Sequence, residues 1–507
     1  MEQLSEQDII QIEEKGISIN SIEQQINSFK RGFPFAKLMG AVSPQNGILQ
    51  LNDELVDSYS GFYIKDSESF KIVKFVPASG AASRMFKHLF EFREALDTTT
   101  YQILRSSKEH NKAIEFFNNI NNFAFSEELN DLVNINDYSE ITEYTKEVLD
   151  MLLTAKGMNY AELPKALLKF HIYTESSRKA IEEHLVEAVE YANNNSIANI
   201  HFTVSPDHLS LFKAELEELI PVYEYIHRVK FNIEFSTQKP STDTIAVDSN
   251  NELFRDNEGK LVFRPGGHGA LIENLNEIDA DIVFIKNIDN VAIEDKNDST
   301  IIYKKALGSL TIKFQNLIFE YINKIDDSSE INDAISFIET ALGLKIDDNF
   351  ENYSEKEKAK YIKNILNRPL RICGVVPNDG EPGGGPFWVN KDGKMSLQIV
   401  ESAEIDLNNE QQRRIMKAST YFNPVDLICC IKDYKGNKFN LKDYIDPLSA
   451  FISEKSKDGK TLKAMELPGL WNGAMAFWNT IFVEVPIETF NPVKTVNDLL
   501  RDMHKDG

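Results

Sequence analysis

The chain has 507 residues, of which 42% are hydrophobic, and a formal net charge of −24 from 79 acidic and 55 basic side chains. This length can bury a large core and predicts about two to four structural units. An acidic surface repels nucleic acid and anionic lipid, which argues against both as partners. A small polyanion could still bind where basic side chains or a metal gather locally.

Cysteine usage and the N-terminus indicate a cytoplasmic protein without a membrane span. The three cysteines, Cys373, Cys429 and Cys430, form no CxxC pair, and the last two lie in an apolar run typical of a strand. The first six residues are acidic and do not resemble a signal peptide. Apolar runs of about 18 residues, which a membrane helix needs, do not occur.

The hydrophobic pattern predicts an α/β protein. Residues 1 to about 60 are expected to be helical, beginning with a capping box at Ser5 and Asp8. Helical blocks are also expected at about 88–160 and 302–366, with a short helix from Val496. The apolar, β-branched runs predict buried strands. These strands are expected at 72–76, 200–204, 228–235, 282–285, 370–376, 396–400, 426–431 and 480–485.

The first expected strand breaks at Pro77 into a loop of small residues that ends in a cation. The loop consists of Ala78, Ser79, Gly80, Ala81, Ala82 and Ser83, and Arg84 follows where a helix is expected. Small side chains, backbone N–H groups and a helix N-terminus suit a phosphate group. Close packing of a strand on a helix would explain the same small residues, so the loop alone does not decide between the two readings.

Three other positions place a charge at a defined point of the chain. Lys165 follows Pro164, and Lys494 lies two residues after Pro492. Asp289 and Asn290 follow the strand expected at 282–285, and ligands of open α/β sheets bind beyond the carboxyl ends of the strands. A carboxylate there suits Mg²⁺, which takes one or two carboxylates together with phosphate oxygens. Surface lysines and an Asp-Asn turn are the structural alternatives.

Two further motifs could contact a ligand, and His268 in the first of them could hydrogen-bond a base or a phosphate. Gly266, Gly267 and Gly269 surround His268, which predicts a tight loop with little side-chain packing around the imidazole. Glu401 and Glu404 follow the strand expected at 396–400 and could hold sugar hydroxyls. The alternatives are a structural histidine and a solvated loop.

In this order, the motifs resemble those of the eukaryotic-type UDP-sugar pyrophosphorylases, above all the UDP-N-acetylglucosamine pyrophosphorylases. The resemblance covers about residues 71–498. The matching segments are Ser79–Met85, Pro164-Lys165, Gln238, Gly266–Leu271, Asp289-Asn290, Gly374–Val376, Asp392-Gly393, Val400–Glu404, Phe422-Asn423 and Asn491–Lys494. The chain is also similar to a bacterial family that carries only a domain-of-unknown-function label.

The resemblance implies a nucleotidyltransferase fold, which is GT-A-like and Rossmann-like, with a mixed sheet flanked by helices. It implies an N-terminal helical segment (1–65), a catalytic domain (66–440) and a C-terminal segment (441–507) that completes the site through Lys494. The implied reaction joins an NTP, expected to be UTP, to a sugar-1-phosphate with Mg²⁺ and releases pyrophosphate.

The resemblance also implies a role for each matched residue. Arg84, Lys165 and Lys494 would be catalytic, and Asp289 would bind the metal. The nucleotide would contact Ala78, Ser79, Gly80, Ala81, Ala82, Ser83, Gln238, Gly266, Gly267, His268 and Gly269. The sugar would contact Asn290, Gly374, Glu401 and Asn423.

Several departures from the family pattern leave alternatives open. Ser79 and Ala82 replace expected glycines, and Ser402 replaces a tyrosine. A glycosyltransferase of related fold that uses a nucleotide sugar, or an inactive nucleotide- or sugar-binding protein, would share the fold. A dinucleotide dehydrogenase is disfavoured because no GxGxxG follows a strand. The sequence leaves open the sugar, the nucleotide and the oligomeric state.

Overall fold

The computed structural model describes residues 4–378, 380, 383–422, 426–457 and 459–506. Contacts divide the chain into two compact units, each assembled from three separated segments. Unit 1 comprises Met1–Lys71, Gln238–Phe284 and Lys305–Ile487, and unit 2 comprises Ile72–Thr237, Ile285–Lys304 and Glu488–Gly507. Among the described residues, no helix combines the length and the apolarity needed to cross a membrane.

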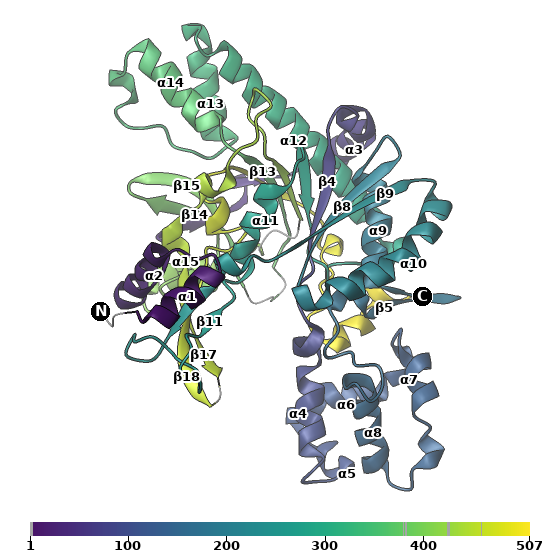
Figure 1. The fold of residues 1–507 in the computed structure, drawn as a ribbon. Coiled ribbons are helices and arrows are strands. Elements are labelled where there is room, and N and C mark those ends of the chain that lie inside the picture. The colour runs from purple at the N-terminus through teal and green to yellow at the C-terminus, as the bar shows by residue number, and fades with distance from the viewer. Residues whose placement is uncertain (1–3, 379, 381–382, 423–425, 458, 507) are drawn as a thin grey trace. The chain divides into compact units, whose positions relative to one another are not determined.

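Unit 1 contains helices and strands from all three of its segments (Figure 1). The helices are α1 (Glu6–Glu14), α2 (Ile19–Arg31), α3 (Asp53–Ser67), α11 (Ile272–Glu277), α12 (Asp298–Lys324, whose first residues belong to unit 2), α13 (Ile331–Thr340), α14 (Glu355–Leu366) and α15 (Glu410–Lys417). The strands are β1 (Leu38–Ala41), β2 (Ser43–Pro44), β3 (Gly47–Leu49), β10 (Thr244–Val247), β11 (Phe263–Arg264), β12 (Ile282–Ile285), β13 (Leu370–Val375), β14 (Gly385–Lys391), β15 (Lys394–Val400), β16 (Asp426–Cys430), β17 (Phe451–Lys457), β18 (Lys460–Glu466) and β19 (Asn479–Glu484).

The central strands of unit 1 form a mixed sheet in the order β2-β3-β19-β13-β16-β12. Strand β13 pairs parallel to β19 and antiparallel to β16, so the strand direction reverses between β13 and β16. Every residue of β13 and β16 is buried, which explains why their sequences are apolar except for Arg371 and Asp426. Two smaller sheets, β1-β14-β15 and β11-β10-β18-β17, complete this unit.

Unit 2 combines a mostly parallel group of strands with two sets of helices. Its helices are α4 (Lys87–Ala95), α5 (Tyr101–Leu104), α6 (Asn111–Asn118), α7 (Ser126–Leu132), α8 (Ile141–Leu153), α9 (Ala180–Tyr191) and α10 (Leu209–His227), and its strands are β4 (Ile72–Pro77), β5 (Lys169–Tyr173), β6 (Ser176–Lys179), β7 (Asn193–Asn194), β8 (Ile197–Val204) and β9 (Lys230–Thr237). β8 pairs parallel to both β4 and β9. In Figure 1, α9 and α10 lie beside β8 and β9, whereas α4 to α8 gather into a separate helical group.

The expected elements are largely present, and the α/β class is confirmed. Each strand expected from an apolar run forms, with ends shifted by no more than a few residues, and the capping box at Ser5 and Asp8 is present. Cys429 and Cys430 are buried in β16, as their apolar surroundings predicted. The expectation of helix throughout residues 1–60 was wrong, because β1, β2 and β3 occupy 38–49. The expected short helix at the C-terminus consists of two 3₁₀ turns, Val496–Leu500 and Asp502–His504.

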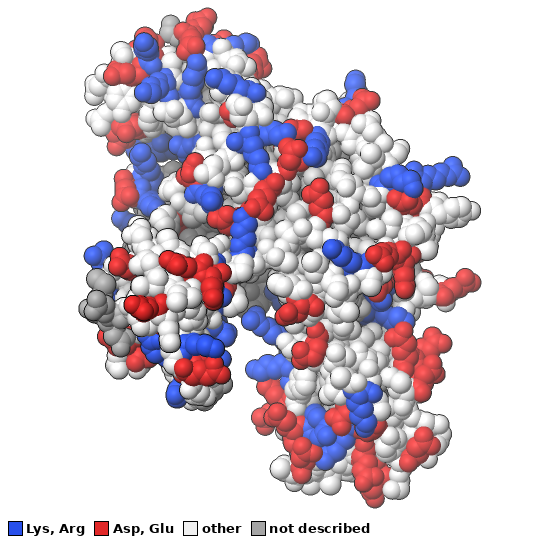
Figure 2. Space-filling view, viewed as in Figure 1, with Lys and Arg blue, Asp and Glu red and all other residues white. Residues whose placement is uncertain are grey.

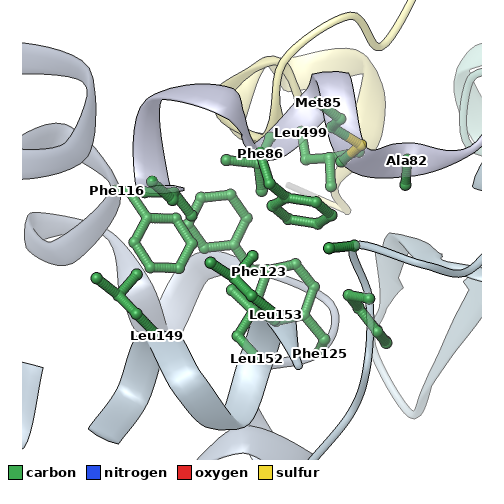
Figure 3. Close-up of a cluster of buried hydrophobic side chains, with 14 of the residues drawn as sticks. Ala82, Met85, Phe86, Phe116, Phe123, Phe125, Leu149, Leu152, Leu153 and Leu499 are labelled. Atoms are coloured by element: carbon green, nitrogen blue, oxygen red, sulfur yellow. The ribbon is translucent and has the colours of Figure 1, made fainter. Parts of the chain in front are cut away.

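One hydrophobic cluster, which we call the unit 2 core, joins the helical group to the loops that carry the predicted site residues. Figure 3 shows Phe86, Phe116 and Leu499 as part of this cluster, which also includes Val291 and Val493. Its aromatic rings pack in tilted, edge-on and stacked arrangements, such as Phe116 on Phe123 at 5.0 Å between ring centroids. The cluster therefore brings parts of all three segments of unit 2 together.

The last residues of the chain are anchored by a buried histidine pair. His171 Nε2 lies 2.9 Å from His504 Nδ1, and His171 Nδ1 lies 2.9 Å from a carboxylate oxygen of Glu183. Both imidazoles are buried, with residue exposures of 0% and 1%. Asp506 N also donates to the carbonyl of Ile172 in β5. These contacts hold the end of the C-terminal segment against β5.

Charged side chains of both signs are interspersed on the face of the molecule drawn in Figure 2. No broad basic field covers that face, in keeping with the net charge of −24.

Glu187, Lys74 and Lys286 form a buried ion cluster, which we call the Glu187 network. It connects α9 to the chain segments that precede two predicted site loops. The Glu187 carboxylate accepts from Lys74 Nζ at 2.8 Å and from Lys286 Nζ at 2.6 Å, and all three side chains are at most 1% exposed. Burial by itself would raise the pKa of Glu187, but the charges of Lys286 and Lys74 hold it well below its usual range. Glu187 is therefore ionised and compensates the Lys286 ammonium group, while burial lowers the pKa of the neighbouring Lys74 to about 7.

We expect Glu187→Gln to lower the free energy of unfolding by about 3–5 kcal/mol, because it leaves buried ammonium groups without a counter-charge. Urea denaturation followed by circular dichroism measures this loss. Adding Lys286→Met should recover part of it, since removing both partners of a buried pair is tolerated better than removing one.

The matched control is Glu217→Gln, which makes the same change at an exposed position on α10 and should alter stability little. Equal stability of Glu187→Gln and Glu217→Gln would contradict the role given to this network.

Candidate active site

The small-residue loop after β4 is open over part of its length. The N–H groups of Ser79, Gly80 and Ala81 donate to no acceptor among the described residues. A Cβ placed on Gly80 would meet no atom within 4 Å, so the backbone there is accessible. Consecutive unbonded amides of this kind suit an anion.

Two of the predicted nucleotide contacts in this loop, Ala78 and Ala82, have amides that the fold already uses. Ala78 N donates to Thr203 O at 2.8 Å, and Ala82 N donates to Leu163 O at 3.0 Å. Ala82 is fully buried in the unit 2 core and begins a 3₁₀ turn, so α4 starts only at Lys87. Arg84 lies in that turn and is exposed to solvent.

Lys165 and Asp289 form the best-defined polar contact of this region. Lys165 Nζ donates to Asp289 Oδ2 at 2.7 Å and to the carbonyl of Val493 at 2.6 Å. The two side chains are 14% and 20% exposed, so they are shielded but accessible. Lys165 N also donates to Gly80 O at 3.4 Å, which ties this pair to the open loop. All of these residues lie in unit 2.

The C-terminal segment reaches the same contact. Val493 N donates to Asp289 O at 3.0 Å, and Asn290 Oδ1 accepts from Asn491 N at 2.7 Å. Lys494 follows directly and is exposed, while its N–H donates to Asp498. The structure thus brings together Lys165, Asp289 and the backbone next to Lys494. The buried Asn290 amide is occupied by residues 489–491.

The position of Asp289 depends on the Glu187 network. Lys74 lies in β4, which leads into the open loop, and Lys286 lies three residues before Asp289. His184 Nε2 is 3.1 Å from the carbonyl of Ile288 and must donate to it, so the proton lies on Nε2. Burial keeps the pKa of His184 well below 6.5, and the imidazole is neutral.

A second cluster, within unit 1, centres on His268. Its Nδ1 accepts from Leu470 N at 3.1 Å, so the proton lies on Nε2 and is donated to Glu401 Oε1, also at 3.1 Å. The imidazole stacks on Trp471 with 4.7 Å between ring centroids. The expectation that glycines deprive His268 of side-chain packing was therefore wrong.

The glycines of the 266–269 loop allow the backbone of other segments to pack closely against the loop, and they do not line an open space. A Cβ on Gly269 would lie 2.1 Å from Pro468 O, and one on Gly266 would lie 2.6 Å from Thr242 O. Gly267 has φ of +77°, a conformation that favours glycine. These residues fit the loop tightly onto residues 467–471, which positions His268.

The remaining predicted residues have the following surroundings. Gln238 follows β9 and donates to Thr242 Oγ1 at 3.4 Å. Gly374 is buried in β13, where a Cβ would contact Val485 and Asp426. Asn423 lies outside the described residues.

Glu404 is the most strongly perturbed acid near this cluster. Its Oε2 accepts from Glu401 N at 2.8 Å and from Asn472 Nδ2 at 3.4 Å. Burial, together with the negative charges of Glu401 and Asp446, raises the pKa of Glu404 to about 7. A carboxyl that titrates near neutrality in a polar site is a candidate for ligand binding or proton transfer.

The surroundings of Asp289 supply one carboxylate for a magnesium ion. Among the described residues, no group of three or more His, Cys, Asp or Glu side chains is arranged to hold a metal ion. Lys165 contacts Asp289 Oδ2, and Asp289 Oδ1 accepts no hydrogen bond from the described residues. One carboxylate oxygen beside a phosphate site fits Mg²⁺, which takes its other ligands from phosphate and water.

Sequence reasoning missed several of these contacts. Trp471 and Asn472 lie in the segment Leu467–Gly473, whose Pro-Gly and Asn-Gly dipeptides signalled turns but no chemistry. The carbonyl of Val493 was invisible to residue-type arguments because it is a backbone group. The raised pKa of Glu404 depends on burial, which the sequence alone did not provide.

The model of a domain of unknown function, DUF4301, matches residues 5–505. The chain belongs to this family. No curated protein matches it.

Solved structures similar to this DUF4301 chain are UDP-sugar pyrophosphorylases of low identity. A UDP-N-acetylglucosamine pyrophosphorylase from Trypanosoma brucei, solved with an inhibitor, is 10% identical with a TM-score of 0.49, over 95% of this chain and 74% of that one. A UDP-glucose phosphorylase from the same organism is 12% identical with a TM-score of 0.45, over 97% and 77%. A UDP-glucose pyrophosphorylase variant from Leishmania major is 13% identical with a TM-score of 0.44, over 99% and 79%. At this level the likeness carries no conclusion about activity.

The pKa of Glu404 predicts how stability depends on pH. A carboxyl whose pKa is raised on folding favours the folded state while it is protonated, and this contribution is lost as pH rises through about 7. We expect the free energy of unfolding of the wild type to fall between about pH 5 and pH 8, relative to Glu404→Gln. Urea denaturation across this range measures the difference.

Glu410→Gln changes an exposed acid at the start of α15 and serves as the control. Parallel pH profiles for wild type and Glu404→Gln would show that Glu404 titrates in its ordinary range.

Proposed function

We propose that the chain is a sugar-1-phosphate nucleotidyltransferase, which joins an NTP, expected to be UTP, to a sugar-1-phosphate. The observation that carries the proposal is the contact of Lys165 with Asp289 beside the open amides of Ser79 to Ala81. A shielded cation, unbonded backbone amides and a single carboxylate are the groups that phosphoryl-type transfer requires. The order of motifs along the chain, which resembles the UDP-sugar pyrophosphorylases, supports the same reaction.

In the proposed reaction, a phosphate oxygen of the sugar-1-phosphate attacks the α-phosphorus of the NTP. A new P–O bond forms there, the bond between that phosphorus and the oxygen bridging to the β-phosphorus breaks, and pyrophosphate leaves. No protein atom becomes covalently attached. Catalysis consists of positioning and of neutralising charge, so the cations of unit 2 are assigned to it.

Each cation has a distinct place in this proposal. Arg84 is exposed at the end of the open loop and is assigned to the triphosphate together with the free amides. Lys165 is assigned to the α-phosphate, because its ammonium is held in place by Asp289 and by Val493 O. Lys494, exposed and next to Val493, is assigned to the sugar phosphate.

Asp289 would hold Mg²⁺ through Oδ1, and the ion when bound would neutralise charge on the phosphate oxygens. Lys165 keeps the Asp289 carboxylate oriented through Oδ2. The Glu187 network holds the preceding backbone through the bond from His184 to Ile288 O.

The unit 1 cluster is assigned to the uncharged parts of the substrates. Glu401, oriented by the Nε2 proton of His268, offers its second oxygen to sugar hydroxyls. Gln238 and the 266–269 loop are assigned to the base, and Gly374 and Asn423 to the sugar, as the resemblance implies. Asn290 is assigned to the sugar on the same ground.

A nucleotide-binding protein without catalysis is the second candidate. It is favoured by Ala82, whose buried amide is bonded to Leu163 O and cannot contact a phosphate. This removes one donor from the loop while leaving Ser79, Gly80 and Ala81 open.

We expect pyrophosphate release from at least one pair of NTP and sugar-1-phosphate in the presence of Mg²⁺, with UTP preferred. The measurement is a coupled pyrophosphate assay over the four NTPs and a panel of sugar-1-phosphates. Failure of every pair while NTP still binds would support the second candidate and contradict nucleotidyl transfer.

With an active pair in hand, Lys165→Ala should lower kcat by about 10²–10³, the usual cost of removing one charge that stabilises a transition state. Lys213→Ala removes an exposed lysine from α10 and should leave kcat unchanged. If Lys165→Ala retains full kcat, the role given to this residue is wrong.

A further inference from the structure

Unit 1 contains a cavity of about 440 Å³ that the proposed reaction does not use. It is lined by three separated segments, near residues 34–37, 389–404 and 446–449. The lining residues that carry the following argument are Phe35, Lys37, Lys391, Glu404, Asp446 and Ser449. All of them lie within unit 1.

Glu404 presents an incompletely bonded carboxyl to this cavity. Oε2 takes both of its hydrogen bonds, from Glu401 N and Asn472 Nδ2, and Oε1 takes none from the described residues. Glu404 lines the cavity and is only partly buried, so its Oε1 is available to accept a hydrogen bond from a ligand in the cavity.

The charges around the cavity select a ligand class. Lys391 pairs with Asp446 at 2.5 Å, while Lys37 and Glu404 add one more charge of each sign. A strongly anionic ligand would meet the two carboxylates, and a strongly cationic ligand would meet the two ammonium groups. Hydroxyl groups donate and accept, so a polyol can use both kinds of partner.

Apolar groups at the cavity suit the carbon face of a ring. Phe35 and Leu448 line it and are 56% and 51% exposed, although both are large hydrophobic side chains. The volume is within the range of small-molecule sites. Apolar walls with a few polar groups of both signs are therefore present at a size suited to one sugar ring.

The geometry points to this cavity as a second ligand site, which binds an unphosphorylated monosaccharide. Glu404 and Ser449 hydrogen-bond its hydroxyls, and Phe35 packs against the ring. The bond from Glu401 N to Glu404 Oε2 makes this site adjacent to the His268 cluster. The inference does not depend on nucleotidyl transfer.

Binding is tested on the full chain with D-glucose, D-mannose and N-acetyl-D-glucosamine, by isothermal titration calorimetry and saturation-transfer NMR. At least one of these sugars should bind, and Phe35→Ala should weaken its affinity about tenfold or more. Phe62→Ala is the matched control, since Phe62 on α3 is 57% exposed and lies outside the cavity lining. Glu404→Leu, which removes both acceptor oxygens, should abolish binding, with folding checked by circular dichroism.

Absence of binding by all three sugars would overturn the inference, as would equal affinities of Phe35→Ala and Phe62→Ala. Glu401→Gln distinguishes the two sites and should retain the sugar. Loss of binding in Glu401→Gln with retention in Phe35→Ala would place the sugar at Glu401 instead. Because the readout is binding, it is independent of whether pyrophosphate is released.

Discussion

The buried carboxylate of Glu187 holds β4 to the segment of unit 2 that leads to Asp289. Lys74 belongs to β4, which continues into the open loop, and Lys286 precedes Asp289 by three residues. A buried charge has few acceptable arrangements, because every ammonium group near it must be compensated at short distance. The network thus fixes the end of β4 relative to the segment that carries Asp289.

The unit 2 core extends this constraint to the rest of the site. Ala82, Val291 and Val493 belong to the cluster, and each lies within two or three residues of a predicted phosphate contact. In unit 1, His268 is positioned differently, because glycines in its loop allow backbone-to-backbone contact. One site is therefore positioned by buried charge and side-chain packing, and the other mainly by close backbone contact.

The sequence predicted most clearly those features that depend on local pattern. Mainly apolar runs predicted the buried strands β4, β8, β12, β13 and β16, because burial on both faces leaves few polar residues in a strand. The pattern missed β5, β6, β14, β17 and β18, in which polar residues are interspersed, and the short strands β1 to β3, β7, β10 and β11.

The site residues, like the strands, were predictable where the signal was a local sequence pattern and were missed where it depended on long-range contacts. Lys165 and Asp289 were found because a charge beside a proline or after a buried strand is a local signal, and they proved to be in contact. The stacking of His268 on Trp471 joins residues about 200 positions apart, which no local pattern reports. The occupied amide of Ala82 likewise depends on Leu163, far along the chain.

The three-segment construction of unit 2 has a consequence for biosynthesis. Residues 72–304 leave the ribosome before the last segment, Glu488–Gly507, which supplies Val493, Val496 and Leu499 to the unit 2 core. At about 5–20 residues per second, the intervening stretch takes on the order of ten seconds to translate. During that interval the apolar surface around Phe86 and Phe116 is not covered by the C-terminal segment. We therefore expect the nascent chain to bind chaperones.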